Sequence, residues 1–371
     1  MMASHYEVPR YDYPGQFADL DTDLVPRIRE VLVEGNYVLG EPVAEFEREL
    51  AAYIGTGQAV GVNSGTDALV LALHALGVGA GDEVITVANT FHSTAMAISR
   101  VGATPVIVDC EPDSHLINLG QVESSITDRT AAVIVVHLFG MAVDMDAAAE
   151  LCRRKGVRLI EDCAQAIGAR WAGSRVGSRS DAGCWSFAPS KNLAAAGDAG
   201  AITLNDKETT DRLRLLRHFG QQAQNDHRLV GYNSRLDTLQ ALVLSHKLPH
   251  LDRWNEQRTA IAEHYRQRLG DLPISLQNGP AAAGHVYHLF QVDTEPRDEL
   301  LAHLRGRSID AVVRYPVPIH LQEAFRQLGY KPGDLPVAER LAMKTLCLPL
   351  YPSMTERQVD LVCTEVANFF G

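Results

Sequence analysis

Short apolar runs and amphipathic stretches alternate along the first part of the chain, which predicts a layered α/β domain. From Val43 to Pro189, β-branched runs bounded by Gly, Pro and Asp alternate with segments of helical period. The runs are nearly continuous in apolar residues, as burial on both faces by crossover helices requires, so a largely parallel sheet is expected. The expected strands are 83–87, 105–109, 132–136, 158–161, 183–187 and 200–204, and the expected helices are 66–76, 93–101, 145–155 and 207–219.

The pattern changes after Asn233. Helical spacing continues from Asp237 to Leu269 with only Pro249 as an interruption, which predicts a connector into a second domain. The remaining chain predicts a smaller α+β unit with strands near 287–292 and 311–313 and helices near 297–304, 336–345 and 355–369. We therefore expect an N-terminal arm and a large α/β domain over 1–245, and a small C-terminal α+β domain over 246–371. The first thirty or so residues lack a strong pattern and are expected to lie as an arm over the body or a partner subunit.

Composition and charge limit the classes of function. The 371 residues carry 34 Lys and Arg against 46 Asp and Glu, so neither a nucleic acid nor an anionic membrane is expected as a partner. No apolar run approaches the roughly 18 residues of a membrane span, and the first residues lack signal-peptide features, so a cytoplasmic location is expected. The six cysteines show no metal-site spacing, which favours reduced, mostly buried thiols and no bound metal.

The segment 63–69 is a candidate anion site, because a short turn there opens directly into an apolar-periodic helix. Free backbone N–H groups at a helix start bind anions, and the glycine at position 65 allows a phosphate to approach closely. The alternative is that Ser64 or Thr66 only caps the helix. The segment matches neither a Walker loop nor G-x-G-x-x-G.

Two further stretches carry candidate chemistry. Asp162 follows an apolar strand at its carboxyl end, where a partly buried carboxylate needs a cationic partner such as a protonated pyridine nitrogen. Its alternative is a helix cap or a surface acid. Lys191 follows an apolar strand among small residues, where desolvation lowers its pKa and frees the amine to attack a carbonyl. The alternative for Lys191 is a surface charge, and Ser186 at the strand end is a candidate phosphate ligand. A phosphate-binding helix start, an acid for a ring nitrogen and a Schiff-base lysine are together what a pyridoxal 5'-phosphate (PLP) site requires.

The sequence resembles the DegT/StrS family of PLP-dependent sugar aminotransferases along essentially its whole length. The resemblance runs from 40–47 to 348–352, and the matching motifs are 62–69, 161–166, 186–193 and 231–237. It implies the fold type I architecture of PLP-dependent aminotransferases, an α/β fold with a large, mostly parallel sheet domain and a smaller C-terminal α+β domain. It also implies a homodimer with shared active sites.

The resemblance implies a role for each matching residue. Lys191 would be the Schiff-base lysine and would shuttle the proton between substrate and cofactor. Asp162 would pair with the pyridine nitrogen, and Gln165 would sit near the ring oxygen. The implied phosphate ligands are the amides of Gly65 and Thr66 and the hydroxyl of Ser186.

Other positions follow from the resemblance less directly. Phe91 falls where the family stacks an aromatic ring on the pyridine, although it also fits a core residue at a helix start. Asn233 is similar to the asparagine that reaches the phosphate bound to the neighbouring subunit. Arg235 either reaches the neighbouring subunit together with Asn233 or forms a surface or interface ion pair. His92 and His320 are candidate substrate contacts, and for His92 the alternative is a polar residue at the pocket edge.

Transamination is the expected reaction, because a branch of the family that carries out dehydration has a histidine in place of Lys191. The resemblance implies L-glutamate or glutamine as donor and the keto group of a nucleotide-linked keto-deoxysugar as acceptor. The product would be an amino sugar for a glycan or a secondary metabolite such as an antibiotic. Two alternatives stay open, an aminotransferase acting on a keto-cyclitol of the aminoglycoside type and a non-catalytic PLP-binding regulatory protein.

Overall fold

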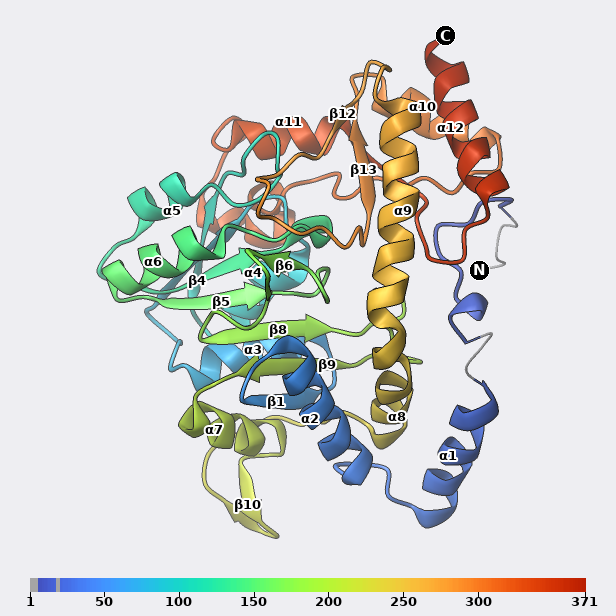
Figure 1. The fold of residues 1–371 in the computed structure, drawn as a ribbon. Helices are drawn as coiled ribbons and strands as arrows, with labels where there is room; N and C mark the ends of the chain where they lie inside the picture. The colour runs from blue at the N-terminus through green and yellow to red at the C-terminus, as the bar shows by residue number, and fades with distance from the viewer. Residues whose placement is uncertain (1–5, 18–20) are drawn as a thin grey trace.

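The larger part of the molecule is built on one seven-stranded sheet. The computed structural model describes residues 6–17 and 21–371 (Figure 1). The strand order is β1-β9-β8-β5-β4-β2-β3, with β9 antiparallel to both of its neighbours and the other pairs parallel. The strands are β1 (Gln58–Val62), β2 (Glu83–Val87), β3 (Thr104–Val108), β4 (Thr130–Val136), β5 (Arg158–Asp162), β8 (Ala182–Ser186) and β9 (Gly200–Leu204).

Helices cover both faces of this sheet, which is why its strands read as continuous apolar runs. One buried cluster joins the sheet to α3 (Gly65–Ala75) and α7 (Lys207–Arg217), and the other joins it to α2 (Glu41–Ile54), α6 (Met145–Lys155) and α8 (Thr238–Lys247). The remaining helices of this part are α1 (Asp21–Glu34), α4 (His92–Arg100) and α5 (Leu119–Ser125), and its short strands are β6 (Arg170–Trp171), β7 (Ser174–Arg175), β10 (Gln221–Ala223) and β11 (Asp226–His227).

The expected connector is confirmed, with a break at its proline. The segment forms α8, a 3-10 turn over Leu248–His250 that contains Pro249, and α9 (Leu251–Leu269). Proline lacks the N–H that an α-helix interior needs, so the chain tightens there and then resumes the helix. In Figure 1, α9 rises from the edge of the large sheet to the C-terminal elements.

The C-terminal part is an α+β unit, as expected. Its three-stranded antiparallel sheet has the order β12-β13-β14. The elements are β12 (Ser275–Leu276), β13 (Phe290–Asp293), β14 (Thr345–Leu348), α10 (Arg297–Gly306), α11 (Pro336–Lys344) and α12 (Glu356–Phe370). The strand expected at 311–313 is wrong: Val312 forms only an isolated bridge with Cys347.

The N-terminal segment packs against the body of the molecule at two places. Val8 is fully buried and pairs with Ile309, so the first described residues pack into the small domain. Farther along, Leu24 and Val31 of α1 pack against α8. The N-terminal segment therefore lies over both the small domain and the large one.

The cysteines and the helices bear on the expected reduced thiols and on the expected lack of a membrane span. All six cysteines are buried and none is in a disulfide. Across 6–17 and 21–371, no helix combines the length and the apolar character needed to cross a bilayer.

Candidate active site

A cavity of about 300 Å³ opens where β2, β4, β5 and β8 end, and the sequence-predicted residues converge on it. Open α/β sheets bind ligands outside the carboxyl ends of their parallel strands, so this is the expected place for a site. The walls include seven of the predicted residues: Gly65, Thr66, Phe91, Asp162, Gln165, Ser186 and Lys191.

The start of α3 forms one end of the cavity. Ser64 caps the helix, because its Oγ accepts the N–H of Asp67 at 3.1 Å. Ala68 is the first residue whose N–H reaches a helical carbonyl, so the amides of Gly65 and Thr66 have no acceptor within the helix. A Cβ on Gly65 would lie 2.5 Å from the Cβ of Ser186, so only glycine fits there. Ser64 therefore caps the helix, and the amides of Gly65 and Thr66 remain available for an anion in the cavity.

Asp162 occupies another wall of the cavity as a buried carboxylate, and no cationic side chain of the described residues forms an ion pair with it. It is the last residue of β5, and its oxygens accept the hydroxyl of Thr94 at 2.8 Å and the N–H of Ala164 at 3.2 Å. Burial raises the pKa of Asp162, against the lowering effect of these two hydrogen bonds and of the positive charge of Lys191. A cation placed opposite this carboxylate would relieve the cost of its burial.

Lys191 lies on the cavity wall, on the loop that follows β8. Desolvation lowers the pKa of its amine to about 8, with the nearby carboxylate of Asp162 opposing the shift and the guanidinium of Arg314 adding to it. A pKa near 8 leaves a sizeable fraction of neutral amine at physiological pH, which a surface lysine does not have. The amine is therefore prepared for attack on a carbonyl.

The loop of Lys191 is held in place by its neighbour Asn192. The buried amide of Asn192 donates to Asn255 Oδ1 of α9 at 2.9 Å and to the carbonyl oxygen of Val286 at 3.0 Å, and its oxygen lies 3.1 Å from Nδ1 of His288. These contacts tie the loop to the connector and to the segment leading into β13. Rigid support of this kind fixes the position of a reacting group.

Gln165, Phe91 and Tyr315 form the remaining face of the site. The Phe139 N–H donates to Gln165 Oε1 at 2.6 Å, and Gln165 Nε2 donates to the hydroxyl of Tyr315 at 3.1 Å. The ring of Phe91 is half exposed and lies 5.6 Å from the ring of Tyr315. A half-exposed aromatic ring on a cavity wall suits stacking on a planar ligand, which favours the stacking interpretation of Phe91 over a core residue.

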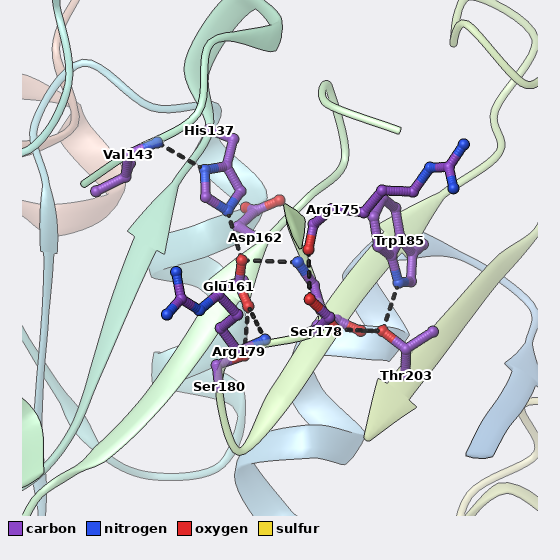
Figure 2. A network of polar contacts seen from close by, with 12 residues as sticks. His137, Val143, Glu161, Asp162, Arg175, Ser178, Arg179, Ser180, Trp185 and Thr203 are labelled. Atoms are coloured by element: carbon purple, nitrogen blue, oxygen red, sulfur yellow. Dashed lines mark hydrogen bonds and ion pairs between the residues drawn. The ribbon is translucent and has the colours of Figure 1, made fainter. Parts of the chain in front are cut away.

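A buried polar network supports the site from the other face of β5 (Figure 2). His137 Nδ1 accepts the N–H of Val143 at 3.0 Å, so the neutral ring carries its proton on Nε2 and donates it to Glu161 at 2.9 Å. Glu161 also accepts the N–H of Gly177 at 2.7 Å and the hydroxyl of Ser180 at 2.8 Å. The hydrogen bonds from His137, Gly177 and Ser180 outweigh desolvation and lower the pKa of the Glu161 carboxyl.

His137, Glu161 and Cys163 also lie close enough together to hold a metal ion. Their hydrogen bonds argue for a structural role instead. Each oxygen of Glu161 already accepts two donors, and both ring nitrogens of His137 are occupied. Burial also raises the pKa of the Cys163 thiol well above its usual value, which disfavours the thiolate that a metal needs.

Four of the predicted residues lie outside the cavity lining. Asn233 is exposed and its backbone pairs with His218. Arg235 stacks over the ring of Phe219, with 4.9 Å between its guanidinium carbon and the ring centre. His92 packs against Phe325, with 5.2 Å between ring centres. The buried side chain of His320 lies 3.0 Å from the carboxylate of Glu339.

The sequence did not predict the rest of the cavity lining, which includes Tyr11, Thr94, His288, Arg314 and Tyr315. Thr94 follows Phe91 by three residues on α4, a spacing that could have indicated a shared face. The other four come from the N-terminal segment and the C-terminal part, and no local pattern connects them to Lys191. Only the folded chain brings them together.

The donor set fits a phosphorylated pyridine aldehyde. Helix amides and the Ser186 hydroxyl suit a phosphate, the Asp162 carboxylate suits a protonated ring nitrogen, and the Lys191 amine lies on the wall of the same cavity to meet the aldehyde carbon. Phe91 offers a face for the ring. The residues present therefore match PLP at its phosphate, its ring nitrogen, its aldehyde and its ring face.

Comparison with known proteins identifies relatives over nearly the whole chain. The model of the DegT/DnrJ/EryC1/StrS aminotransferase family matches residues 18–367. The dTDP-3-amino-3,4,6-trideoxy-alpha-D-glucose transaminase of Streptomyces venezuelae is 45% identical over 372 residues, 99% of this chain and 98% of its own. The pleiotropic regulatory protein of Geobacillus stearothermophilus is 43% identical over 367 residues, 98% of each chain.

Solved structures agree with the fold and with the cofactor. A crystal structure of S. venezuelae DesV in complex with a ketimine intermediate superimposes with a TM-score of 0.96, at 44% identity and 98% coverage of both chains. Other solved neighbours are described with the cofactor in its PMP or PLP form. PLP is therefore the cofactor, and the architecture is that of the PLP-dependent aminotransferases.

The depressed pKa of Lys191 predicts how capture of PLP by the cofactor-free protein depends on pH. Below about pH 8 the amine is protonated and cannot attack, so the capture rate should rise about tenfold per unit and level off above pH 8. Stopped-flow absorbance of the bound cofactor between pH 6.5 and 10 measures this. Free N-acetyl-lysine is the control, since its rate keeps rising to about pH 10. A protein rate that follows the free amine would contradict a desolvated Lys191.

Proposed function

The chain belongs to the DegT/DnrJ/EryC1/StrS aminotransferase family, and we propose that it moves an amino group from L-glutamate or glutamine to the keto group of a nucleotide-linked keto-deoxysugar. It is a PLP-dependent transaminase. The observation that carries the proposal is the convergence of the Lys191 amine, the Asp162 carboxylate and the α3 amides on one cavity. The S. venezuelae relative, named as a dTDP-sugar transaminase, supports a nucleotide-linked sugar as the acceptor.

The protein's own groups bind and orient the cofactor. When bound, PLP supplies an electron sink for the carbon that bears the amino group. The amides of Gly65 and Thr66 and the hydroxyl of Ser186 hold its phosphate, and the helix dipole favours that negative charge. Asp162 keeps the ring nitrogen protonated by pairing with it, and Phe91 covers the ring face. The roles of these residues belong to the proposal.

Lys191 acts as the acid and base of the reaction. Its amine would hold the cofactor, and it would serve as the base once a donor is bound there. The free amine then takes the proton from the donor carbon and returns it to the cofactor carbon, and the same transfer runs backward with the keto-sugar. The low pKa of Lys191 suits both directions near neutral pH.

Two alternatives differ in what the site does. A keto-cyclitol would use the same groups, so only an assay with both acceptors separates it from a keto-sugar. A regulatory protein that binds PLP without turnover is suggested by the name of the G. stearothermophilus relative. Lys191, Asp162 and Gln165 all line the cavity of this chain, which favours turnover over simple binding.

We also infer a homodimer in which Asn233 serves the neighbouring active site. Asn233 is exposed and outside the cavity of its own chain, so a phosphate ligand at this position needs a second copy. Exposed apolar side chains flank it, with Phe219 41% and Val230 89% exposed. On α1, Val33 is 74% exposed. Apolar surfaces of this kind are typical of an interface between subunits.

A cytoplasmic location is part of the same proposal. Its support is the set of six buried, unpaired cysteines, because thiols stay reduced in the cytoplasm.

Absorption spectroscopy tests the donor half of the reaction. L-glutamate should bleach the visible band of the PLP-loaded protein, and Lys191→Ala should slow this by at least about 100-fold because the proton shuttle is lost. Lys155→Ala, a change on α6 away from the cavity, is the matched control and should react as the wild type does. Keto-sugar or keto-inositol added to the bleached protein should then restore the band for one acceptor. A loaded wild type that no amino acid bleaches would contradict transamination.

Subunit mixing tests the shared site. Lys191→Ala and Asn233→Ala dimers, each impaired, should regain about a quarter of wild-type activity after exchange, because half the dimers are mixed and carry one intact site. Lys191→Ala mixed with a Lys191→Ala, Asn233→Ala double variant is the control and should stay inactive. If the first mixture gains nothing although mixed dimers form, Asn233 acts within its own chain.

A further inference from the structure

Arg314 lines the active-site cavity without a carboxylate partner. Among residues 6–17 and 21–371, no Asp or Glu oxygen lies within ion-pair distance of its guanidinium. Desolvation lowers the pKa of Arg314, and Tyr11, Tyr315 and Cys347 together raise it above its usual value; none of these three groups is a carboxylate. Because the guanidinium is partly buried and always charged, it is a binding group for an anion.

The charges of the cavity show which anions Arg314 can take. The described wall carries two carboxylates: Asp162 is used by the ring nitrogen, and the exposed Asp198 forms no ion pair with Arg314. The phosphate is held at the start of α3. Lys191 loses its charge once its nitrogen is bonded to the cofactor. Arg314 is then the remaining positive charge on the wall, close enough to Lys191 to lower the pKa of that amine. The missing anion must therefore arrive with a substrate.

The amino donor supplies an anion at the right place. Its nitrogen must take the position of the Lys191 amine, so its α-carbon is one bond away and its α-carboxylate two. The side-chain carboxylate of glutamate and the diphosphate of a nucleotide-sugar lie several bonds farther from that nitrogen. Of the three anions, only the α-carboxylate must lie near the reacting nitrogen whatever the donor's side chain is.

We propose that Arg314 binds the α-carboxylate of the amino donor and so selects α-amino acids over simple amines. The guanidinium can meet a carboxylate with two parallel hydrogen bonds, which would orient the donor's α-carbon beside Lys191. The next residue, Tyr315, accepts a hydrogen bond from Gln165, which holds this part of the cavity wall in place. The inference rests on the proposed transamination but holds for either donor, since glutamate and glutamine share this group.

Arg314→Gln tests the proposal through three amines. L-glutamine lacks the side-chain charge of L-glutamate, and 4-aminobutyrate is glutamate without the α-carboxylate. The variant should lose about 10- to 100-fold in kcat/KM of the donor half-reaction with both amino acids, mainly through KM. The preference of the wild type for glutamate over 4-aminobutyrate should fall by the same factor. Arg314→Lys should keep part of the preference, and Arg340→Gln, an exposed change on α11, should keep all of it.

A binding measurement separates recognition from turnover. α-Methyl-L-glutamate has no hydrogen on its α-carbon and cannot complete the reaction, so an absorbance titration gives its Kd directly. This Kd should rise about 10- to 100-fold in Arg314→Gln and stay unchanged in Arg340→Gln.

Each other outcome overturns the assignment in a different way. A loss with glutamate but not glutamine would place Arg314 on the side-chain carboxylate. Equal losses with glutamate and 4-aminobutyrate would show that the α-carboxylate is not involved. A loss confined to the half-reaction with the keto-sugar would place Arg314 on the phosphates. A wild type that reacts with no amino acid contradicts the proposed function, whereas a reactive wild type with an equally reactive variant contradicts only the role of Arg314.

Discussion

The burial of Asp162 at the end of β5 is the constraint on which the rest of the site depends. A carboxylate in this position, with only Thr94 and Ala164 donating to it, raises the free energy of the empty site unless a cation stands opposite. A protonated pyridine nitrogen meets that need, and in meeting it the ring becomes an acceptor for the electrons of the reacting carbon. The same burial leaves the Lys191 amine close to neutral. Desolvation in one pocket thus gives the Asp162 carboxylate its need for a cation and leaves the Lys191 amine close to neutral.

That position can be maintained because the opposite face of β5 is fixed. Successive side chains of a strand point to opposite faces, so Glu161 points away from the cavity while Asp162 points into it. Glu161 is held by His137, Gly177 and Ser180 (Figure 2). Gly177 is required there, since it adopts a positive φ of 80° and a Cβ on it would lie 2.3 Å from Trp185. The buried charge of Glu161 is therefore stabilised by these three residues, and the groups that face the cavity do not contribute to it.

The sequence predicted what depends on local pattern. α6 and β9 begin and end where the periodicity places them, and the motifs around Gly65, Asp162, Ser186 and Lys191 converge on one cavity. It did not predict β1, whose apolar run is interrupted by Gly61, or β14, which follows α11 with no turn residue between them. Arg314 was missed for a different reason: the cavity that it lines is made by segments distant in the chain, so no local pattern marks it.

The most direct test of the account is the protonation state of the cofactor's ring nitrogen in the loaded protein. ¹⁵N NMR of ring-labelled PLP reports it, with Asp162→Asn as the comparison and Asp67→Asn, on α3 outside the cavity lining, as the matched control. The account predicts a protonated nitrogen in the wild type and in Asp67→Asn, and a neutral one in Asp162→Asn. A nitrogen that is neutral in the wild type, or protonated in all three proteins, would contradict the central role given to the buried carboxylate.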